Sequence, residues 1–271
     1  MAGGTAGTRA LALALLLATG LAAAADLPRI AIVIDDIGFQ EDLDQAVMAL
    51  DSRVAVAIIP EAPAARQIAQ AAGRQQRDVL IHLPLAGIHQ DNCHLVLTCI
   101  GMGWSAVRMQ SHLADALERV EGAVGINNHQ GSRFTANAQA VGNLIVGISH
   151  LGEQRGQALF VLDSRTSPTT LFEHTALQAG LKATRRHVFL DHSNEPDDIR
   201  RAWLDLIDLA RRNGSAIAIG HPRVNTIRFL EQVLPELDSI EVRLVPVSTL
   251  ARRQHEPKPQ IEAVMLYSPE P

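Results

Sequence analysis

The feature that most constrains this chain is a regular alternation of short apolar runs with longer segments in which apolar residues recur every three or four positions. Near-continuous apolar runs are typical of parallel strands that are covered on both faces, and the three-to-four-residue period is typical of helices. The alternation therefore favours βα units with right-handed crossovers. The candidate strands lie at 29–34, 54–59, 78–83, 123–126, 158–163, 187–191, 215–220 and 242–247.

Eight candidate strands predict an α/β fold, namely a distorted (β/α) barrel formed by residues 26–251. An open doubly wound sheet is the structural alternative. The connection from Ala86 to Ser105 is too long for an ordinary βα loop, so we expect a separate loop there. The helical patterns that separate the strands include 39–50, 62–75, 106–120, 197–213 and 227–237.

The two ends of the chain read differently from the barrel. Arg9 is followed by an apolar stretch to about Ala18 and then by small residues before Asp26, which is the pattern of a secretory signal peptide over residues 1–25. The stretch is short for a permanent membrane span, so we expect cleavage near Ala25 and a periplasmic protein without a membrane span. Residues 252–271 are rich in proline and polar residues and are predicted to be a flexible tail.

The expected export bears on the redox state of the only two cysteines in the sequence, Cys93 and Cys99. In an oxidising compartment we expect a local disulfide between them, because no other cysteine competes for either. A redox pair fits less well because the spacing is not C-x-x-C, and a zinc site would need His89 and His94 to join. The formal net charge of -5 offers no basic footprint for nucleic acid.

Polar side chains collect directly after six of the eight candidate strands. In a (β/α) barrel the carboxyl ends of all strands share one rim, where active sites lie, so these residues are expected to meet. The first strand ends in two adjacent carboxylates within the stretch "IAIVIDDIGF". The residues concerned are Asp35, Asp36, His82, Asn127, Asn128, His129, Ser132, Arg133, Asp163, Ser164, Arg165, Asp191, His192 and His221.

Each of these residues also has a purely structural explanation. Either aspartate of the pair could cap the helix that follows, and His82 could be a satisfied core residue. Asp163 and Arg165 could form an ion pair that braces the rim. A single metal site, however, explains several positions together, since one carboxylate and two neutral imidazoles are a good ligand set for zinc or a similar divalent ion. A dication would also offset the repulsion between the adjacent carboxylates.

These residues in this order resemble the divergent polysaccharide deacetylase family, which is related to the NodB-type carbohydrate esterases. The resemblance rests on "IAIVIDDIG", "VLIHLPL", "GINNHQGSRFT", "LFVLDSRTS", "HVFLD", "AIAIGHP" and "LVPVS", and it covers roughly residues 29 to 250. It implies a distorted barrel, export to the periplasm and descent from metal-dependent enzymes that hydrolyse the amide bond of N-acetylated sugars.

The resemblance also implies roles for particular residues. Asp35 falls on the general base, Asp36 and His82 on metal ligands, and His221 on the acid that protonates the leaving amine. The family pattern expects a second metal histidine four residues after the first, but position 86 is alanine, and the arginine-proline motif is missing. We predict that His129 supplies the third ligand. Asn128, Ser132, Asp163, Arg165 and Asp191 are predicted to orient substrate or brace the ligands.

Three functional hypotheses follow. The preferred one is a periplasmic, metal-dependent hydrolase, with zinc as the expected ion, that removes acetyl groups from an N-acetylated polysaccharide or a peptidoglycan-type glycan. The second is a non-catalytic member of the fold that binds a glycan or an envelope protein. The third is a metal-dependent hydrolase of another bond, because the same activation of water serves esters and amides alike.

Overall fold

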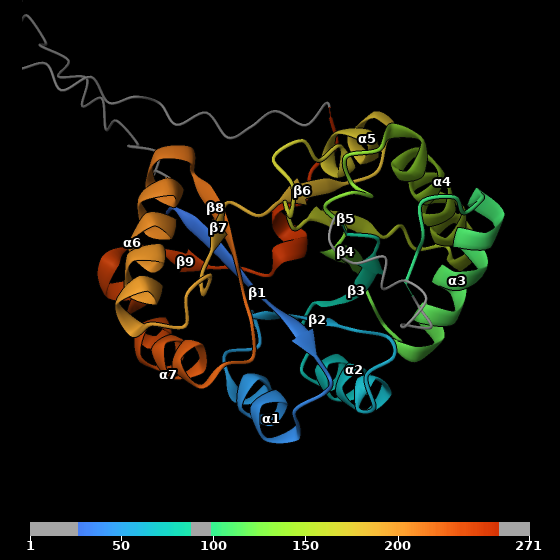
Figure 1. The fold of residues 1–271 in the computed structure, drawn as a ribbon. Helices are drawn as coiled ribbons and strands as arrows, with labels where there is room; N and C mark the ends of the chain where they lie inside the picture. The colour runs from blue at the N-terminus through green and yellow to red at the C-terminus, as the bar shows by residue number, and fades with distance from the viewer. Residues whose placement is uncertain (1–26, 88–98, 255–271) are drawn as a thin grey trace, which may run out of the picture.

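A computed structural model of the chain describes residues 27–87 and 99–254, in which a curled parallel sheet is surrounded by helices (Figure 1). The sheet runs in the order β6-β5-β4-β3-β2-β1-β8-β7, and β9 pairs with the start of β1. The predicted distorted (β/α) barrel is therefore confirmed. The strands are β1 (Arg29–Ile37), β2 (Ala55–Ile58), β3 (Val79–Leu85), β4 (Gly125–Gln130), β5 (Phe160–Asp163), β6 (Ala183–Arg185), β7 (Val188–Phe189), β8 (Ser215–Gly220) and β9 (Arg243–Leu244).

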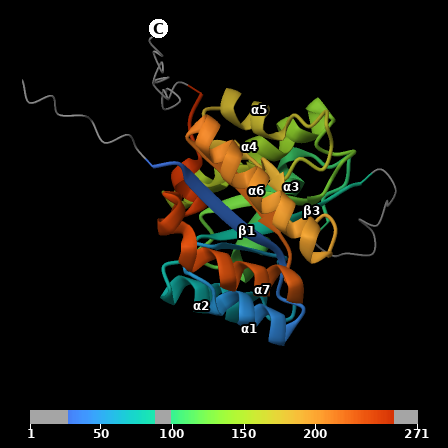
Figure 2. The same ribbon diagram turned by 90° about the vertical axis from the view of Figure 1, so that its left-hand side faces the viewer.

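Helices cover the outside of this sheet, as the two views at right angles show (Figure 2). Among residues 27–87 and 99–254, no helix combines the length and apolarity that crossing a membrane requires. The helices are α1 (Glu41–Ala49), α2 (Ala65–Arg74), α3 (Ala106–Arg119), α4 (Ala138–Arg155), α5 (Phe172–Gln178), α6 (Pro196–Asn213) and α7 (Val224–Val233), with the 3-10 helices η2 (Leu234–Ile240) and η3 (Val247–Leu250).

One extended segment joins the two edges of the sheet. β6 pairs with β5 and β7 pairs with β8, yet only two residues separate β6 from β7. The backbone N–H of Arg186 donates to Asp163 on the β5 side at 2.9 Å, and that of His187 donates to Ile217 on β8 at 2.9 Å. The segment therefore changes partner between two consecutive residues, which closes the curl without a continuous ladder.

Three of the predicted strands need correction, and one strand was not predicted. The candidate strand 123–126 begins two residues later and continues to Gln130 as β4. The candidate strand 187–191 is β7 and ends at Phe189, and the candidate strand 242–247 is the two-residue β9. β6 was not predicted, because three residues are too few to display a period of two. The predicted strand 215–220 is confirmed as β8.

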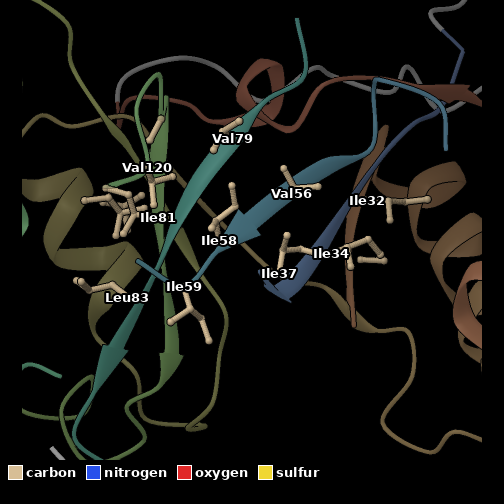
Figure 3. Packing of buried hydrophobic residues seen from close by; sticks show 14 of the residues in the cluster. Ile32, Ile34, Ile37, Val56, Ile58, Ile59, Val79, Ile81, Leu83 and Val120 are labelled. Carbon is tan, nitrogen blue, oxygen red and sulfur yellow. The ribbon is translucent and has the colours of Figure 1, made fainter. Parts of the chain in front are cut away.

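Strict alternation along β1 divides its side chains between two cores. Ile30, Ile32 and Ile34 pack outward in the large core between sheet and helices, part of which Figure 3 shows. Ala31 and Val33 point inward and join the small core inside the barrel. Because side chains alternate with a period of two, the next inward position of β1 is residue 35.

The amino-terminal end of the barrel is closed by apolar side chains. Val247 and Leu250 of η3 pack into the inner core, and the backbone N–H of Ser248 donates to Asp78, just before β3, at 2.8 Å. The interior is so narrow that a Cβ atom on Gly125 would lie 2.7 Å from the ring of Phe160. The carboxyl-terminal end is where the interior becomes polar.

Candidate metal centre

A β-bulge in β1 brings two consecutive aspartates to the same place. Ile34 pairs with Val56, but Ile37 pairs with Ile58, so β1 has one extra residue in this interval. Asp36 has a φ of 58°, a left-handed conformation that aspartate tolerates better than most residues. Without the bulge, adjacent side chains would point to opposite faces of the sheet.

Asp36, His82 and His129 converge from β1, β3 and β4. The Nε2 atom of His82 lies 3.1 Å from Asp36 Oδ1, and the Nδ1 atom of His129 lies 2.9 Å from the same oxygen. The two imidazole nitrogens are 3.1 Å apart. Candidate ligand atoms of all three residues lie within 4.8 Å of one another.

This donor set fits a divalent cation. Asp36 Oδ1 is buried and meets a hydrogen-bond donor only if a facing imidazole nitrogen carries a proton. Neutral imidazoles would direct two nitrogen lone pairs and one carboxylate oxygen at a common point, which is favourable only around a positive charge. Ligand atoms on one tetrahedral zinc ion lie roughly 3.3 Å apart, close to the spacings found here.

The electrostatics point the same way. Burial lowers the pKa of His82, but the charges of Asp35 and Asp36 outweigh it and raise the pKa to about 9. Burial disfavours the carboxylate of Asp36, but hydrogen bonding and charge from His129 and His82 hold its pKa well below the usual range. The cluster thus demands positive charge, which a proton or a metal ion can supply.

Asn127 fixes the orientation of His82. The Nδ1 atom of His82 lies 3.0 Å from Asn127 Oδ1, an acceptor, so Nδ1 carries the hydrogen and Nε2 faces Asp36. The Nδ2 group of Asn127 donates to Asp35 Oδ1 at 2.8 Å and to Ser164 Oγ at 3.2 Å. An outer hydrogen bond of this kind is what normally sets the tautomer of a metal-binding histidine.

Asp35 lies beside the three candidate ligands but is more deeply buried, with 3% of its surface exposed. Its Oδ2 atom is 3.6 Å from His82 Nε2, while Oδ1 is held by Asn127. Burial raises the pKa of Asp35, partly offset by the charges of His82 and His221 and by the Asn127 hydrogen bond. One oxygen of Asp35 is therefore tethered and the other is turned toward the cluster.

His221 approaches from β8 and is oriented by Asp191. The Nδ1 atom of His221 lies 2.8 Å from Asp191 Oδ1, and Nε2 lies 3.9 Å from Asp36 Oδ2. Asp191 Oδ2 accepts from the backbone N–H of His221 and from Thr226 Oγ1, each at 2.8 Å. Burial opposes the charge of both groups, but their mutual attraction raises the pKa of His221 and lowers that of Asp191.

The other predicted residues lie around this cluster rather than in it. Asp163 points away from the barrel interior and accepts from the backbone N–H of Arg165 at 2.8 Å and from Thr170 Oγ1 at 2.8 Å. Asn128 accepts from the backbone N–H of Ser164 at 2.9 Å. Ser132 is half-buried in the loop after β4, and Arg165 is exposed. The roles assigned to them stay predictions.

The region after β3 bears on two further predictions. Ala86, where the resemblance expects a histidine, is buried, and its N–H donates to Ile100 O at 3.1 Å. Cys99 is buried, but Cys93 lies outside the described residues, as do His89 and His94. The predicted disulfide between Cys93 and Cys99 therefore stays a prediction.

Asn127 and Ser164 were among the polar residues expected at the rim but were given no role, although strand parity places them with the inward-facing side chains. Asn127 has the same parity as His129 on β4, and Ser164 has the same parity as Phe160 and Leu162, which face the inner core from β5. Alternation places them with the inward-facing side chains, whereas Asn128 and Asp163 have the opposite parity.

A comparison with protein families agrees with this geometry. Residues 32–251 match the family model described as "Divergent polysaccharide deacetylase". The chain belongs to the divergent polysaccharide deacetylase family. The match spans every strand from the middle of β1 onward, and with it the five residues of the cluster and its flanks: Asp35, Asp36, His82, His129 and His221.

Two proteins are similar in sequence to this one over most of its chain. An uncharacterized protein of Haemophilus influenzae is 39% identical over 240 residues, which cover 86% of this chain and 81% of the relative. The uncharacterized protein YibQ of Escherichia coli is 37% identical over 222 residues, which cover 82% of this chain and 67% of the relative.

Solved structures with lower identity share the fold. An uncharacterized protein of Agrobacterium tumefaciens superimposes with a TM-score of 0.77 at 23% identity, covering 84% of this chain and 91% of the other. A putative cellobiose-phosphate cleavage protein of Enterococcus faecalis superimposes with a TM-score of 0.56 at 14% identity, covering 83% of this chain and 100% of the other. These likenesses concern the barrel alone.

Proposed function

We propose that this protein is a periplasmic, metal-dependent hydrolase that removes acetyl groups from an N-acetylated glycan. The observation that carries the proposal is the convergence of Asp36, His82 and His129 on one point, with Asp35 and His221 on either side. Membership of the divergent polysaccharide deacetylase family supports a carbohydrate as the substrate class.

A divalent ion held by the three ligands, with zinc the expected one, would polarise the acetamide carbonyl and favour ionisation of water. Asp35 is the group that takes the proton of the attacking water, and it does so at Oδ2, because Oδ1 is bound to Asn127. His221 donates a proton from Nε2 to the departing amine, and Asp191 holds its ring in the orientation that this requires.

The loss of the usual second histidine does not favour the non-catalytic alternative. Position 86 is a buried alanine in the main-chain hydrogen bonding after β3, so it is not available as a ligand. His129 offers an imidazole nitrogen 3.1 Å from that of His82. His129, from the next strand, would restore the count of three ligands that a catalytic zinc site needs.

The test compares release of acetate with metal content in the full chain. Wild type, loaded with zinc, is incubated with chitooligosaccharide and with peptidoglycan fragments. Asp35→Asn and His221→Gln should each keep the metal and lose activity by about 10²- to 10⁴-fold, as expected for loss of a general base or acid. His150→Gln, an exposed histidine on α4, is the matched control and should change neither property.

The outcomes separate the hypotheses. A bound metal with no acetate released from either substrate would favour the glycan- or protein-binding alternative. Release of acetate that survives in Asp35→Asn would contradict the role given to that carboxylate. Release from a simple ester but from no N-acetylated sugar would favour a hydrolase of another bond.

Export is tested separately, since residues 1–26 lie outside the described part of the chain. We expect the protein in the periplasmic fraction with residues 1–25 removed, which mass spectrometry of the intact protein measures. An uncleaved chain in the cytoplasmic fraction would contradict this part of the proposal.

A further inference from the structure

Arg186 is half-buried beside the candidate metal centre, and no carboxylate lies within ion-pair distance of it among the described residues. Its Nε group donates to the carbonyl of Ser164 at 2.8 Å, and one terminal nitrogen donates to the carbonyl of Arg165 at 2.9 Å. A guanidinium has five N–H donors, so these two bonds leave most of its capacity unused, and the charges of Asp35 and Asp163 act on it only from beyond ion-pair distance. A buried charge is normally paired.

A second arginine, Arg165, lies close enough to Arg186 for the two charges to repel each other. Arg165 is exposed, and its side chain has no hydrogen-bond or ion-pair partner in the described parts of the chain. Its backbone has a φ of 50°, and that conformation is held by the Asp163 carboxylate on the N–H of Arg165 and by Arg186 on its carbonyl. Strained backbone that is fixed from several sides is found preferentially at ligand-binding positions.

The two arginines border the proposed catalytic residues. The carbonyl of Ser164 accepts from Arg186, while the hydroxyl of Ser164 accepts from Asn127, which holds Asp35. On the other side, the guanidinium carbon of Arg186 lies 4.9 Å from the ring centre of Phe189, whose ring is 5.2 Å from that of His221.

We propose that Arg165 and Arg186 form a subsite for an acidic group on the glycan, so that the substrate is an anionic glycan rather than a neutral one. The inference rests on the proposed function and adds to it the charge of the substrate. The acidic group is a carboxylate or a phosphate ester, because both present the paired oxygens that the planar fork of a guanidinium recognises.

Two adjacent positive charges of this kind need a counter-ion to be favourable. Burial and the charge of Arg165 lower the pKa of Arg186, and the charges of Asp35 and Asp163 offset this only in part, so a further anion would stabilise the pair. By contrast, the neighbouring Arg185 is paired with Glu173 at 3.6 Å. Arg185 therefore has an ion-pair partner within the protein, whereas Arg186 has none among the described residues.

The experiment measures binding of three oligosaccharides of equal length to the full, metal-loaded chain by calorimetry. One is a neutral N-acetylglucosamine oligomer, one alternates N-acetylglucosamine with N-acetylmuramic acid and so bears carboxylates, and one is a phosphorylated N-acetylglucosamine oligomer. An Asp35→Asn background prevents their consumption. At least one acidic oligosaccharide should bind about tenfold more tightly than the neutral one, the gain expected from one charge-assisted bidentate contact.

The variants show where any preference originates. Arg165→Gln and Arg186→Gln should each reduce the preference to less than about twofold, whereas Arg185→Gln, which removes the same charge from the same segment, should leave it intact. Arg165 is exposed, so its variant remains informative even if Arg186→Gln fails to fold. The tighter of the two acidic oligosaccharides identifies the acidic group.

Three results would overturn the inference: equal binding of neutral and acidic oligosaccharides, binding of neither, or a preference that survives in Arg165→Gln. These outcomes are separable from failure of the proposed function. Acetate release from neutral and acidic glycans at equal rates would leave the hydrolase in place and remove the subsite. A preference for the acidic oligosaccharide without acetate release from any glycan would leave the subsite in place and remove the hydrolase.

Discussion

At the amino-terminal end of the barrel the buried charge of Arg77 meets an acceptor on every side, whereas at the carboxyl-terminal end three potential metal ligands converge and need added positive charge, from a proton or a metal ion. The guanidinium of Arg77 donates to four backbone carbonyls and to the side chain of Gln75. Asp36 Oδ1, in contrast, faces two imidazole nitrogens. Both regions are polar, but only in the first are the hydrogen-bonding groups matched by fixed partners within the protein.

The two regions differ as a structural and a functional polar cluster do within one fold. A self-satisfied cluster stabilises the protein and calls for no ligand. A cluster of one carboxylate and two imidazoles needs added positive charge, and a bound cation can replace the protons that otherwise supply it. The following substitutions test whether the two regions differ in this way.

The largest expected effect is at Arg77. Arg77→Met should lower the free energy of unfolding by roughly 3 kcal/mol, because it removes the guanidinium that donates to the carbonyls of Leu50 and Val54 in a buried region. Urea denaturation monitored by circular dichroism measures the change. Arg74→Met, at an exposed position on α2, is the control and should have little effect. A loss of under about 1 kcal/mol at Arg77 would show that this cluster does not stabilise the fold as a structural polar cluster should.

A smaller, pH-dependent effect is expected at Asp191. This carboxylate supports the site, and both of its oxygens accept hydrogen bonds within the protein. Asp191→Asn should cost roughly 1–2 kcal/mol above pH 4, because an amide whose oxygen accepts from the His221 backbone N–H and from Thr226 has no second oxygen to accept from the His221 ring. The folded state holds the pKa of Asp191 below 3.8, so the unfolded state takes up its proton first as the pH falls.

The contribution of this carboxylate is therefore complete above pH 3.8 and is lost as the pH falls through the lower value in the folded state. The difference in unfolding free energy between wild type and Asp191→Asn should narrow as the pH falls from about 4 toward the lower pKa of the folded state. Denaturation curves at each pH measure it, and a difference that is constant over this range would show that Asp191 is not held as a carboxylate by these contacts.

The smallest effect is expected at Asp36. In protein stripped of metal, Asp36→Gly should lower the free energy of unfolding by less than about 1 kcal/mol, because glycine adopts a positive φ without strain and this offsets the lost contacts with His82 and His129. Asp36→Ala keeps the strain and serves as the comparison. If Asp36→Gly destabilises the metal-free protein as strongly as Arg77→Met does, the carboxyl-end cluster is a structural one.

Much of this architecture was predictable from the sequence, because long apolar runs and helical periods are strong signals. The strand at 215–220, for example, was located without error as β8. β6 was missed and β9 was placed too long, since strands of two or three residues are set by the neighbours that pair with them rather than by a period of their own.

The candidate site was predictable in its residue types but not in its register. Asp36, His82 and His129 were singled out from their positions after strands, and they do meet. What the sequence did not reveal is the bulge that turns Asp36 toward its neighbours, because a bulge depends on the pairing of β1 with β2. Nor did it distinguish Asn127 from Asn128, which requires knowing which residue faces the interior.

The central claim is that the cluster at the carboxyl end of β1, β3 and β4 is a metal centre. The most direct measurement is the metal content of the purified full chain after dialysis against limiting zinc, determined by mass spectrometry of the metal. We predict one divalent ion per chain for wild type and for the control His150→Ala, and none for Asp36→Ala, His82→Ala or His129→Ala. A wild-type protein that binds no ion, or a His129→Ala variant that retains it, would contradict the account.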